Sequence, residues 1–325
     1  MRARARSRPR RPFGWPEVAV DVVEHLPVLA DEVVTALVRG PGWYFDGTVG
    51  GGGHAALLLG ALPAEARLLG FDRDRAALAR AAERLERFGD RVRLVHAPFD
   101  QLGEVMRSER LGSLAGALFD LGLSSLQLGD ASRGFSFSLD APLDLRFDDT
   151  AGAPASDRLM HEQEATLADW FFRYGELRES RKLARAIVAY RTRRAIERTT
   201  DLKDAVSAVW GDRPHPRKLA QLFQALRIAV NDELERVERG LKQAAEALAP
   251  EGRLAVITYH SLEDRLTKRF MSGTLPPRRE AQLGAIRAGL LEPVTRKAIV
   301  PTPSEVAMNP RAGSARLRVA RRIAA

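Results

Sequence analysis

Four short apolar runs, each ending in a polar or glycine-rich turn, alternate with segments of helical periodicity in the first 123 residues. The runs are WYFDG at 43–47, ARLLGFD at 66–72, RVRLVHAPF at 91–99 and LAGALFDLG at 114–122. Between them, segments such as ALARAAERLERF have high helix propensity and apolar positions at helical spacing. Strands that alternate with helices form a parallel sheet covered by helices, so the pattern predicts an α/β fold with a doubly wound, mostly parallel sheet.

The alternation stops near residue 123, where a stretch rich in Ser, Asp, Gly and Pro begins. Two helical patterns follow with no strand between them, one around Phe171 and the other around Ile187. A single long helix is then expected over about 217–248, and a strand pattern resumes at 253–260. The sequence therefore predicts a sheet domain that is interrupted by helices.

We assign residues 21–123 and 217–325 to the sheet core and residues 124–216 to an all-helical insertion. Residues 1–20 are expected to form a disordered basic tail, because six arginines fall within the first eleven residues and no apolar periodicity accompanies them. The tail can serve as an electrostatic arm for RNA phosphates. Alternatively, it is a solvated segment or the product of a mis-chosen start codon.

The amino-acid composition excludes several classes of site and function for this chain. The 325 residues include no cysteine, which excludes structural disulfides, thiolate metal sites and a cysteine nucleophile. No apolar stretch approaches the roughly 20 residues of a membrane helix and no signal-peptide core is visible, so we expect a cytoplasmic protein without a membrane partner. Lysine and arginine total 51 against 42 acidic residues, and this formal charge of +9 favours a polyanionic partner.

A glycine-rich turn, DGTVGGGGH at 46–54, follows the first predicted strand. In open α/β sheets the ligand lies beyond the carboxyl ends of the strands, where such a turn lets it come close. The spacing is not that of the G-x-G-x-x-G dinucleotide fingerprint, which disfavours a nicotinamide cofactor. Asp72, at the end of the second predicted strand, can accept hydrogen bonds from both hydroxyls of a ribose, or it can cap the next helix instead. Phe99 can stack on an adenine.

Acidic residues end three of the predicted strands. Asp46 precedes the glycine loop, Asp72 ends the second strand and Asp120 ends the fourth. Together they suit an adenosine ligand that carries a cation and an amino acid. S-adenosylmethionine fits this description.

Several longer blocks carry a resemblance to a known family. In chain order they are HLPVLADEV, DGTVGGGGH, FDRD, FDLGLSSLQL, RGFSFSLDAPLDLR, YGE, LARAIV, FQALRIAVNDEL, YHSLEDR and NPRAGSARLR. From about residue 25 to the C-terminus the chain resembles the RsmH (MraW) family of bacterial 16S ribosomal RNA cytosine-N4 methyltransferases. The resemblance implies a Rossmann-like class I methyltransferase core with an inserted helical domain, and S-adenosylmethionine as cofactor.

The resemblance also implies a substrate and a set of cofactor residues. The substrate would be the exocyclic amine of a decoding-centre cytidine of 16S rRNA near the ribosomal P site, within the small ribosomal subunit, while a monomer and a homodimer both stay open. The residues expected to bind the cofactor are Gly51, Gly52, Gly53, His54, Asp72, Phe99, Asp120 and Gln127.

Cytosine N4 is a poor nucleophile because its lone pair is delocalised into the ring. The enzyme must accept hydrogen bonds from the amine and align the nitrogen with the methyl group and its sulfonium leaving group. Methylation at ring C5 would need a cysteine nucleophile, which this chain lacks. We take Asp120 as the acceptor for the amine, with the alternative that it serves the cofactor only.

The block TYHSLEDR supplies two further catalytic candidates. Tyr259 can stack on the cytosine, and His260 can take the released proton near neutral pH. The structural alternative is that this block simply starts a helix, because Ser261 and Asp264 have the spacing of a capping box. The other histidines lack metal-ligand spacing, so we expect no essential metal site.

Basic residues beyond residue 123 are candidates for contact with RNA. Arg178, Arg181 and Arg185 lie opposite the apolar face of their predicted helix, and Arg133 lies in RGFSF beside two phenylalanines. Such side chains contact phosphates and unstacked bases, although a basic helix face is often only solvated. A different class of function also stays open, namely a non-enzymatic RNA-binding or ribosome-assembly factor that keeps the fold.

Overall fold

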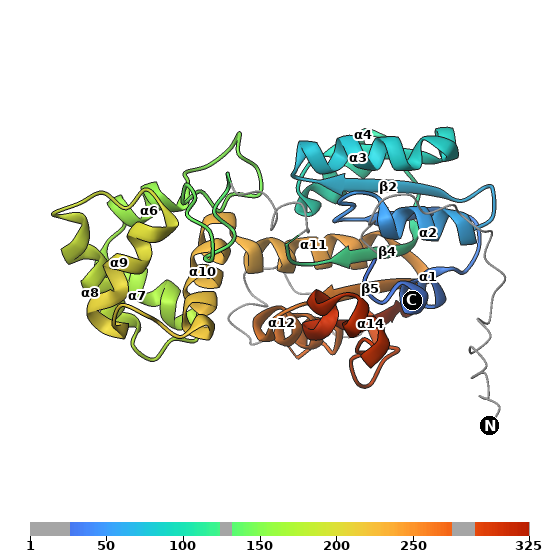
Figure 1. Ribbon diagram of the computed structural model, residues 1–325. Coiled ribbons are helices and arrows are strands. Elements are labelled where there is room, and N and C mark those ends of the chain that lie inside the picture. Colours follow the sequence, from blue (N-terminus) through green and yellow to red (C-terminus); the bar gives the residue numbers. More distant parts are fainter. Residues whose placement is uncertain (1–26, 124–131, 275–289, 325) are drawn as a thin grey trace, which may run out of the picture.

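The computed structural model describes residues 27–123, 132–274 and 290–324, and a seven-stranded sheet forms its centre (Figure 1). Across the sheet the strand order is β3-β2-β1-β4-β5-β7-β6. Neighbours from β3 to β5 run parallel, whereas β7 is antiparallel to β5 and β6. The strands are β1 (Trp43–Asp46), β2 (Arg67–Asp72), β3 (Val92–His96), β4 (Leu114–Asp120), β5 (Leu248–Thr258), β6 (Leu291–Pro293) and β7 (Arg316–Arg322). The doubly wound α/β fold is confirmed.

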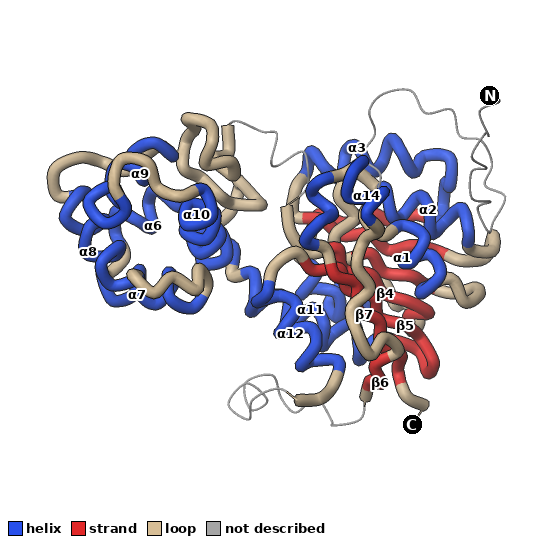
Figure 2. The backbone as a smooth tube through the Cα atoms, turned by 60° about the horizontal axis from the view of Figure 1, so that its bottom comes forward, coloured by secondary structure: helices blue, strands red, loops and turns tan. Residues whose placement is uncertain are grey.

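Helices cover both faces of this sheet (Figure 2). They are α1 (Ala30–Leu37), α2 (Gly53–Ala61), α3 (Arg75–Leu85), α4 (Leu102–Ser108), α11 (Glu233–Ala247), α12 (Ser261–Met271) and α14 (Pro303–Met308), with the 3₁₀ turns η1 (Glu86–Arg91), η2 (Phe99–Gln101) and η3 (Pro310–Ser314). Successive strand residues point to opposite faces. Phe45 therefore packs in one cluster with Val237 of α11, and Tyr44 packs in another with Val33 of α1 and Leu58 of α2.

A second group of helices lies beside the sheet, on the left of Figure 1. This helical lobe consists of α6 (Ala155–His161), α7 (Glu164–Arg173), α8 (Ser180–Arg191), α9 (Thr199–Trp210) and α10 (Pro216–Asn231). Phe171 and Ile187, which mark the two expected helical patterns, are fully buried in it. Across the ranges that the structure describes, no helix is both long and apolar enough to cross a membrane.

The helix expected over 217–248 is in fact two helices, so that expectation was wrong. Asp232 separates α10 from α11 with a left-handed backbone, φ 51° and ψ 38°. An aspartate visits this conformation more readily than most residues do. The apolar stripe continues across the break, from Leu226 to Leu234, and therefore conceals it. In Figure 1, α10 lies in the helical lobe and α11 along the sheet, and we propose that the insertion ends at Asn231 rather than at residue 216.

Asn231, the last residue of α10, is 1% exposed and ties the helix junction to a preceding loop. Its Oδ1 accepts from the backbone N of Phe147 at 2.8 Å, and its Nδ2 donates to the carbonyls of Leu145 at 2.7 Å and Arg227 at 2.9 Å. These bonds hold the loop against the junction of the two helices.

We expect Asn231→Leu to lower the free energy of unfolding by about 1–3 kcal/mol, because it leaves buried peptide groups without partners. Urea denaturation measures the change. Gln163→Leu, at an exposed position whose side chain makes no cap hydrogen bond, is the matched control and should stay within about 0.5 kcal/mol. Equal effects of the two substitutions would contradict the assigned role of Asn231.

Candidate active site

Three carboxylates gather at the carboxyl ends of neighbouring strands. Asp46 ends β1, Asp72 ends β2 and Asp120 ends β4, and β1 lies between the other two strands. The chain order reverses at this point of the sheet, which is where open α/β sheets bind ligands. Burial raises the pKa of Asp46 to about 7 despite the hydrogen bond from the Thr48 backbone, and nearby Asp120 and Asp72 add to the rise.

A cleft of about 630 Å³, counted with its open mouth, lies at this edge of the sheet. The loops after the first four strands line it with Gly47, Thr48, Asp72, Arg73, Phe99, Leu121 and Gly122. Later parts of the chain add Phe147, Glu233, Arg236, Val237 and Glu263. Of the residues expected to bind the cofactor, Asp72 and Phe99 therefore lie on the cleft itself.

The glycine run forms the turn between β1 and α2. Gly52 has φ 79°, and a Cβ there would lie 3.2 Å from the Cα of Ala81 in α3, so a side chain would be strained. A Cβ on Gly53 would lie 2.8 Å from Pro27 Cγ. Around Gly51, by contrast, a Cβ would meet no atom within 4 Å. Gly52 and Gly53 thus serve tight packing within the chain, and a ligand can approach the backbone at Gly51.

Asp72 is held in place by the backbone on either side of it. Its Oδ2 accepts from Gly50 N at 2.8 Å and its Oδ1 from Asp74 N at 2.9 Å. Burial raises the pKa of Asp72, although both hydrogen bonds oppose the rise. The cap of α3 is Asp74, whose Oδ1 accepts from Ala76 N and Ala77 N. The capping alternative for Asp72 is therefore wrong.

Phe99 begins η2, three residues after β3 ends. Its ring meets Phe119 of β4 edge-on, with the ring centroids 5.4 Å apart. A Cβ on Gly240 of α11 would lie 2.5 Å from the Phe99 ring, so the glycine makes room for it. The ring is thus fixed as one wall of the cleft, and its stacking on an adenine stays a prediction.

Asp120 is the centre of a set of side chains from four parts of the chain. The Tyr259 hydroxyl donates to Oδ1 at 2.8 Å, and His54 Nδ1 lies 3.5 Å from Oδ2. The backbone N of Asp120 donates to Thr48 Oγ1 at 2.7 Å. Burial raises the pKa of Asp120, whereas His54 and the Tyr259 hydrogen bond lower it. The other ring nitrogen of His54 lies 2.9 Å from the carbonyl of Val28, so any cofactor contact of His54 would involve its backbone.

Tyr259 follows β5 and packs on Gly122. A Cβ on Gly122, which has φ 115°, would lie 2.9 Å from Tyr259 Cδ2. Burial and the Asp120 carboxylate raise the pKa of the Tyr259 phenol, so the phenol stays a proton donor to Asp120. The side of the ring that meets Gly122 is closed to a base, and the predicted stacking on cytosine would require another side.

His260 caps the N-terminus of α12, a role that the sequence analysis assigned to Ser261 and Asp264. It is the N-cap of α12: its Nδ1 accepts from Glu263 N at 3.5 Å, and Glu263 Oε2 accepts from His260 N at 3.3 Å. The capping box therefore consists of His260 and Glu263, not of Ser261 and Asp264. Asp264 pairs with Arg318 at 2.7 Å instead.

This placement also bears on the catalytic role expected of His260. Its second ring nitrogen, Nε2, lies 3.0 Å from Glu263 Oε1. Nε2 makes no hydrogen bond there, so only Nδ1 is engaged by the capping box, and the role of His260 as the acceptor of the substrate proton stays a prediction.

A group of possible metal ligands occurs beside the cleft, although the sequence analysis expected no metal site. Ligand atoms of Glu233, His260 and Glu263 lie within 4.8 Å of one another. The two carboxylates already have partners, whereas Nε2 of His260 makes no hydrogen bond. Arg227 donates to both oxygens of Glu233 at 2.7 and 2.9 Å, and Glu263 accepts from the backbone of Tyr259 at 2.9 Å. Burial raises the pKa of Glu263, but His260 and Arg227 outweigh it and lower the pKa overall. The group is therefore an internal ion-pair network.

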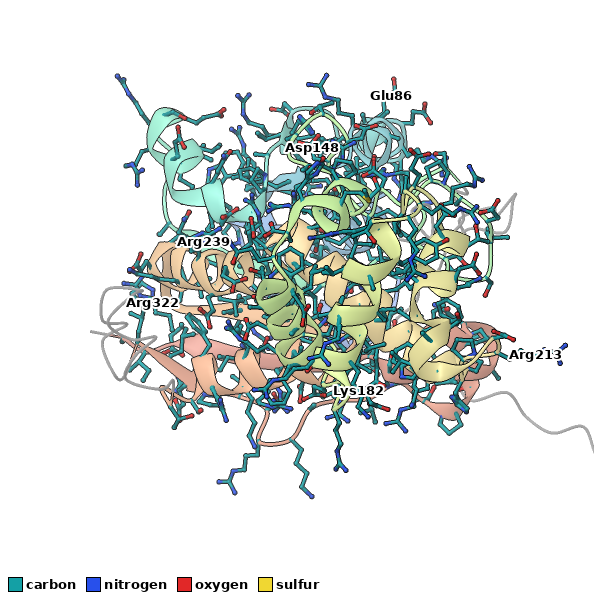
Figure 3. The ribbon with its side chains drawn as sticks, turned by 90° about the vertical axis from the view of Figure 1, so that its left-hand side faces the viewer. Glu86, Asp148, Lys182, Arg213, Arg239 and Arg322 are labelled. Atoms are coloured by element: carbon teal, nitrogen blue, oxygen red, sulfur yellow. The ribbon has the colours of Figure 1, made fainter. Side chains whose placement is uncertain are left out.

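The four arginines expected to bind RNA have different surroundings. Arg178, Arg181 and Arg185 are exposed at the start and along the outer face of α8, and Arg185 lies 3.8 Å from Glu164. Figure 3 faces this lobe, whose Arg213 projects away from the ribbon at the right-hand edge. RNA contact by Arg178, Arg181 and Arg185 stays a prediction.

Arg133 is different, because it is only 14% exposed and has internal partners. Its Nη1 donates to Asp74 at 2.9 Å, and its Nη2 donates to the carbonyls of Arg146 at 2.6 Å and Phe147 at 2.7 Å. It therefore ties the loop before the helical lobe to α3, and contact of Arg133 with RNA stays a prediction.

Comparison with known families supplies the remaining information on this site. Residues 22–323 match the model of the MraW methylase family. The chain belongs to this family. The cofactor of this methylase is S-adenosylmethionine, as the acids and the glycine turn predicted.

The methylase has many curated relatives along nearly its whole length. The ribosomal RNA small subunit methyltransferase H of Heliobacterium mobile is 43% identical over 92% of this chain and 99% of the relative. The protein of the same name from Chromohalobacter salexigens is 46% identical, with 92% of both chains covered. A solved structure, a putative rRNA-methylase from Clostridium thermocellum, matches 90% of this chain and 95% of its own at 15% identity, with a TM-score of 0.42.

Several residues of the methylase that line the cleft escaped the sequence analysis. Glu233 belongs to a block that was quoted only for the resemblance, Arg236 lies two residues after that block, and Glu263 looked like an ordinary residue at the start of a helix. The helical lobe separates these residues from the glycine loop in the sequence, so no local pattern indicated that they lie near it in the fold. Gln127, the remaining residue expected to bind the cofactor, lies outside the described residues.

Proposed function

We propose that this methylase transfers the methyl group of S-adenosylmethionine to the N4 amine of a decoding-centre cytidine in 16S rRNA, within the small ribosomal subunit near the P site. The observation that carries the proposal is the Asp120 carboxylate at the end of β4, held by Tyr259 beside the cleft. The names of its relatives, ribosomal RNA small subunit methyltransferases, support the class of substrate. The same substrate implies a cytoplasmic location.

Residues that line the cleft, together with Asp120 beside it, would have separate roles in the reaction. Asp72 would accept hydrogen bonds from the ribose of the cofactor, and Phe99 would hold its adenine. When bound, the cofactor supplies an electrophilic methyl group on a sulfonium. Asp120, whose side chain is 24% exposed, would accept an N–H of the cytosine amine and so orient the nitrogen toward the methyl group.

The RNA would approach over the helical lobe. The exposed arginines just before and along α8, Arg178, Arg181 and Arg185, can pair with phosphates of an RNA strand. Such contacts position the strand without reading its sequence, so the choice of the base would fall to the cleft.

The proposed function can be tested by incubating the purified protein with labelled S-adenosylmethionine and unmodified small ribosomal subunits. The RNA is then digested, and mass spectrometry identifies the methylated nucleoside. N4-methylcytidine at one site is the expected result. Label on a different base, or no label despite demonstrated cofactor binding, would contradict the proposed substrate. A protein that S-adenosylmethionine does not stabilise against heat would instead fit a non-enzymatic RNA-binding or ribosome-assembly factor.

Asp72→Asn should weaken the binding of S-adenosylmethionine by at least about tenfold, because the amide supplies one acceptor oxygen where the carboxylate supplies two. Isothermal titration calorimetry measures the dissociation constant without RNA. Asp90→Asn, a substitution of a residue whose side chain is 90% exposed, is the matched control and should leave the constant unchanged. An unchanged constant for Asp72→Asn would exclude Asp72 from the ribose site.

A further inference from the structure

His54 stands in an unusual position between the N-terminal segment and Asp120. It lies at the start of α2, is 7% exposed, and has a polar partner at each ring nitrogen. The partner of Nε2 is the carbonyl of Val28 at 2.9 Å, and the partner of Nδ1 is Oδ2 of Asp120 at 3.5 Å. The proposed function assigns no role to the buried imidazole ring of His54.

The chemistry of the two partners limits where protons can be. A carbonyl only accepts hydrogen bonds, so Nε2 must carry a hydrogen. If Nδ1 had none, its lone pair would face a lone pair of the Asp120 carboxylate, which is repulsive. Two states avoid the repulsion: an imidazolium beside a carboxylate, or a neutral imidazole that accepts from a protonated Asp120. Each state has one proton between Nδ1 and Oδ2.

We propose that His54 and Asp120 share one buried proton and that His54 is a positioning residue, which keeps Asp120 negatively charged while the cleft is loaded. This inference rests on the proposed function. Tyr259 supports the charged form because its hydroxyl donates to Oδ1. A sulfonium in the cleft would also favour a carboxylate at Asp120 with the proton on His54.

The protons and charges of the reaction balance in this arrangement. The amine nitrogen of the substrate forms a bond to the methyl group, and the bond between methyl and sulfur breaks with its electron pair left on sulfur. The positive charge passes to the nitrogen, which then gives a proton to the Asp120 carboxylate. The proton leaves to solvent through the exposed part of Asp120 after the products depart.

The neighbouring ionisable groups are few and come from separate elements. Asp46 of β1, Tyr259 after β5 and Glu263 of α12 face Asp120. Near His54, Arg84 of α3 approaches Gly53, and Glu305 of α14 accepts from the backbone N of Leu29. Asp46 and Glu263 both favour the protonated form of Asp120, so the imidazolium is the cation that opposes them at this point.

His54→Gln tests the proposal because a glutamine can still donate to the Val28 carbonyl but leaves Asp120 without a cationic neighbour. We expect the acid limb of single-turnover methyl transfer to move to higher pH, with a rate at least about tenfold lower at pH 6 and within about threefold of the unmodified protein at pH 9. His161→Gln, at an exposed position of α6, is the matched control. A uniform loss of rate with an unmoved acid limb would overturn the proposal.

A measurement without RNA separates this proposal from the proposed function. ¹⁵N NMR of the histidine ring nitrogens reports protonation directly. At neutral pH, with S-adenosylmethionine bound, we expect both nitrogens of His54 to carry hydrogen, and we expect Nδ1 to lose its hydrogen in Asp120→Asn. A bare Nδ1 in the cofactor-bound, unsubstituted protein would overturn the proposal even if cytidine were methylated. The expected NMR result with no N4-methylcytidine would overturn the substrate alone.

Discussion

Asp120→Asn should lower the single-turnover rate of methyl transfer by about 10²- to 10⁴-fold, the usual contribution of a positioned proton acceptor. The amide keeps the shape of the side chain and can still accept from Tyr259, but it cannot take a proton from the methylated amine. Rapid mixing of the cofactor-loaded protein with small ribosomal subunits measures the rate, and calorimetry measures cofactor binding in parallel.

Two results would contradict this role of Asp120. A rate within about tenfold of the unmodified protein would mean that another group accepts the proton, and a loss confined to cofactor affinity would mean that Asp120 serves the cofactor only. Asp169→Asn is the matched control, since Asp169 lies on the exposed face of α7 and pairs with Arg173 there. Its rate should not change.

Arg227→Met should lower the free energy of unfolding by about 3–5 kcal/mol, the usual cost of removing one partner from a buried ion pair. The Arg227 and Glu233 side chains are only 12% and 7% exposed, and two hydrogen bonds join them. Methionine fills similar volume but leaves the Glu233 carboxylate buried without its cation. Urea denaturation followed by circular dichroism measures the loss.

The double variant Arg227→Met, Glu233→Gln removes the stranded charge and should recover a large part of the stability. Arg173→Met is the surface control, because it breaks a pair in which both side chains are about half exposed, and it should cost less than about 1 kcal/mol. If Arg227→Met cost no more than this control, the pair would not be stabilising the junction of α10 and α11.

The sequence predicted the sheet well because strands and helices have different apolar periods. The runs that end at Asp46, Asp72 and Asp120 were recognised as strands, and the parallel order then placed the three acids at one edge. The analysis missed β6, because its three residues are too few to show an alternating pattern. This strand is defined by its antiparallel pairing with β7, which a local sequence pattern does not reveal.

The details of the site were harder to predict because they depend on tertiary contacts. Nothing in DGTVGGGGH shows that the ring of His54 turns toward Asp120, 66 positions later in the chain. Similarly, Ser261 is a stronger N-cap residue than a histidine by intrinsic preference, yet His260 takes that position because the buried Glu263 closes the box around it.

The place of the helical lobe in the chain has a consequence for the order of folding. β4 ends at Asp120 and β5 begins at Leu248, and their parallel pairing closes the whole intervening chain into a loop. Closing a long unstructured loop costs entropy and slows folding. The hairpin of α7 and α8 forms from local contacts, and Asn231 clasps the loop at 145–147. A lobe that forms early would deliver β5 to the edge of β4, and we expect the methyl-transfer site to be completed last.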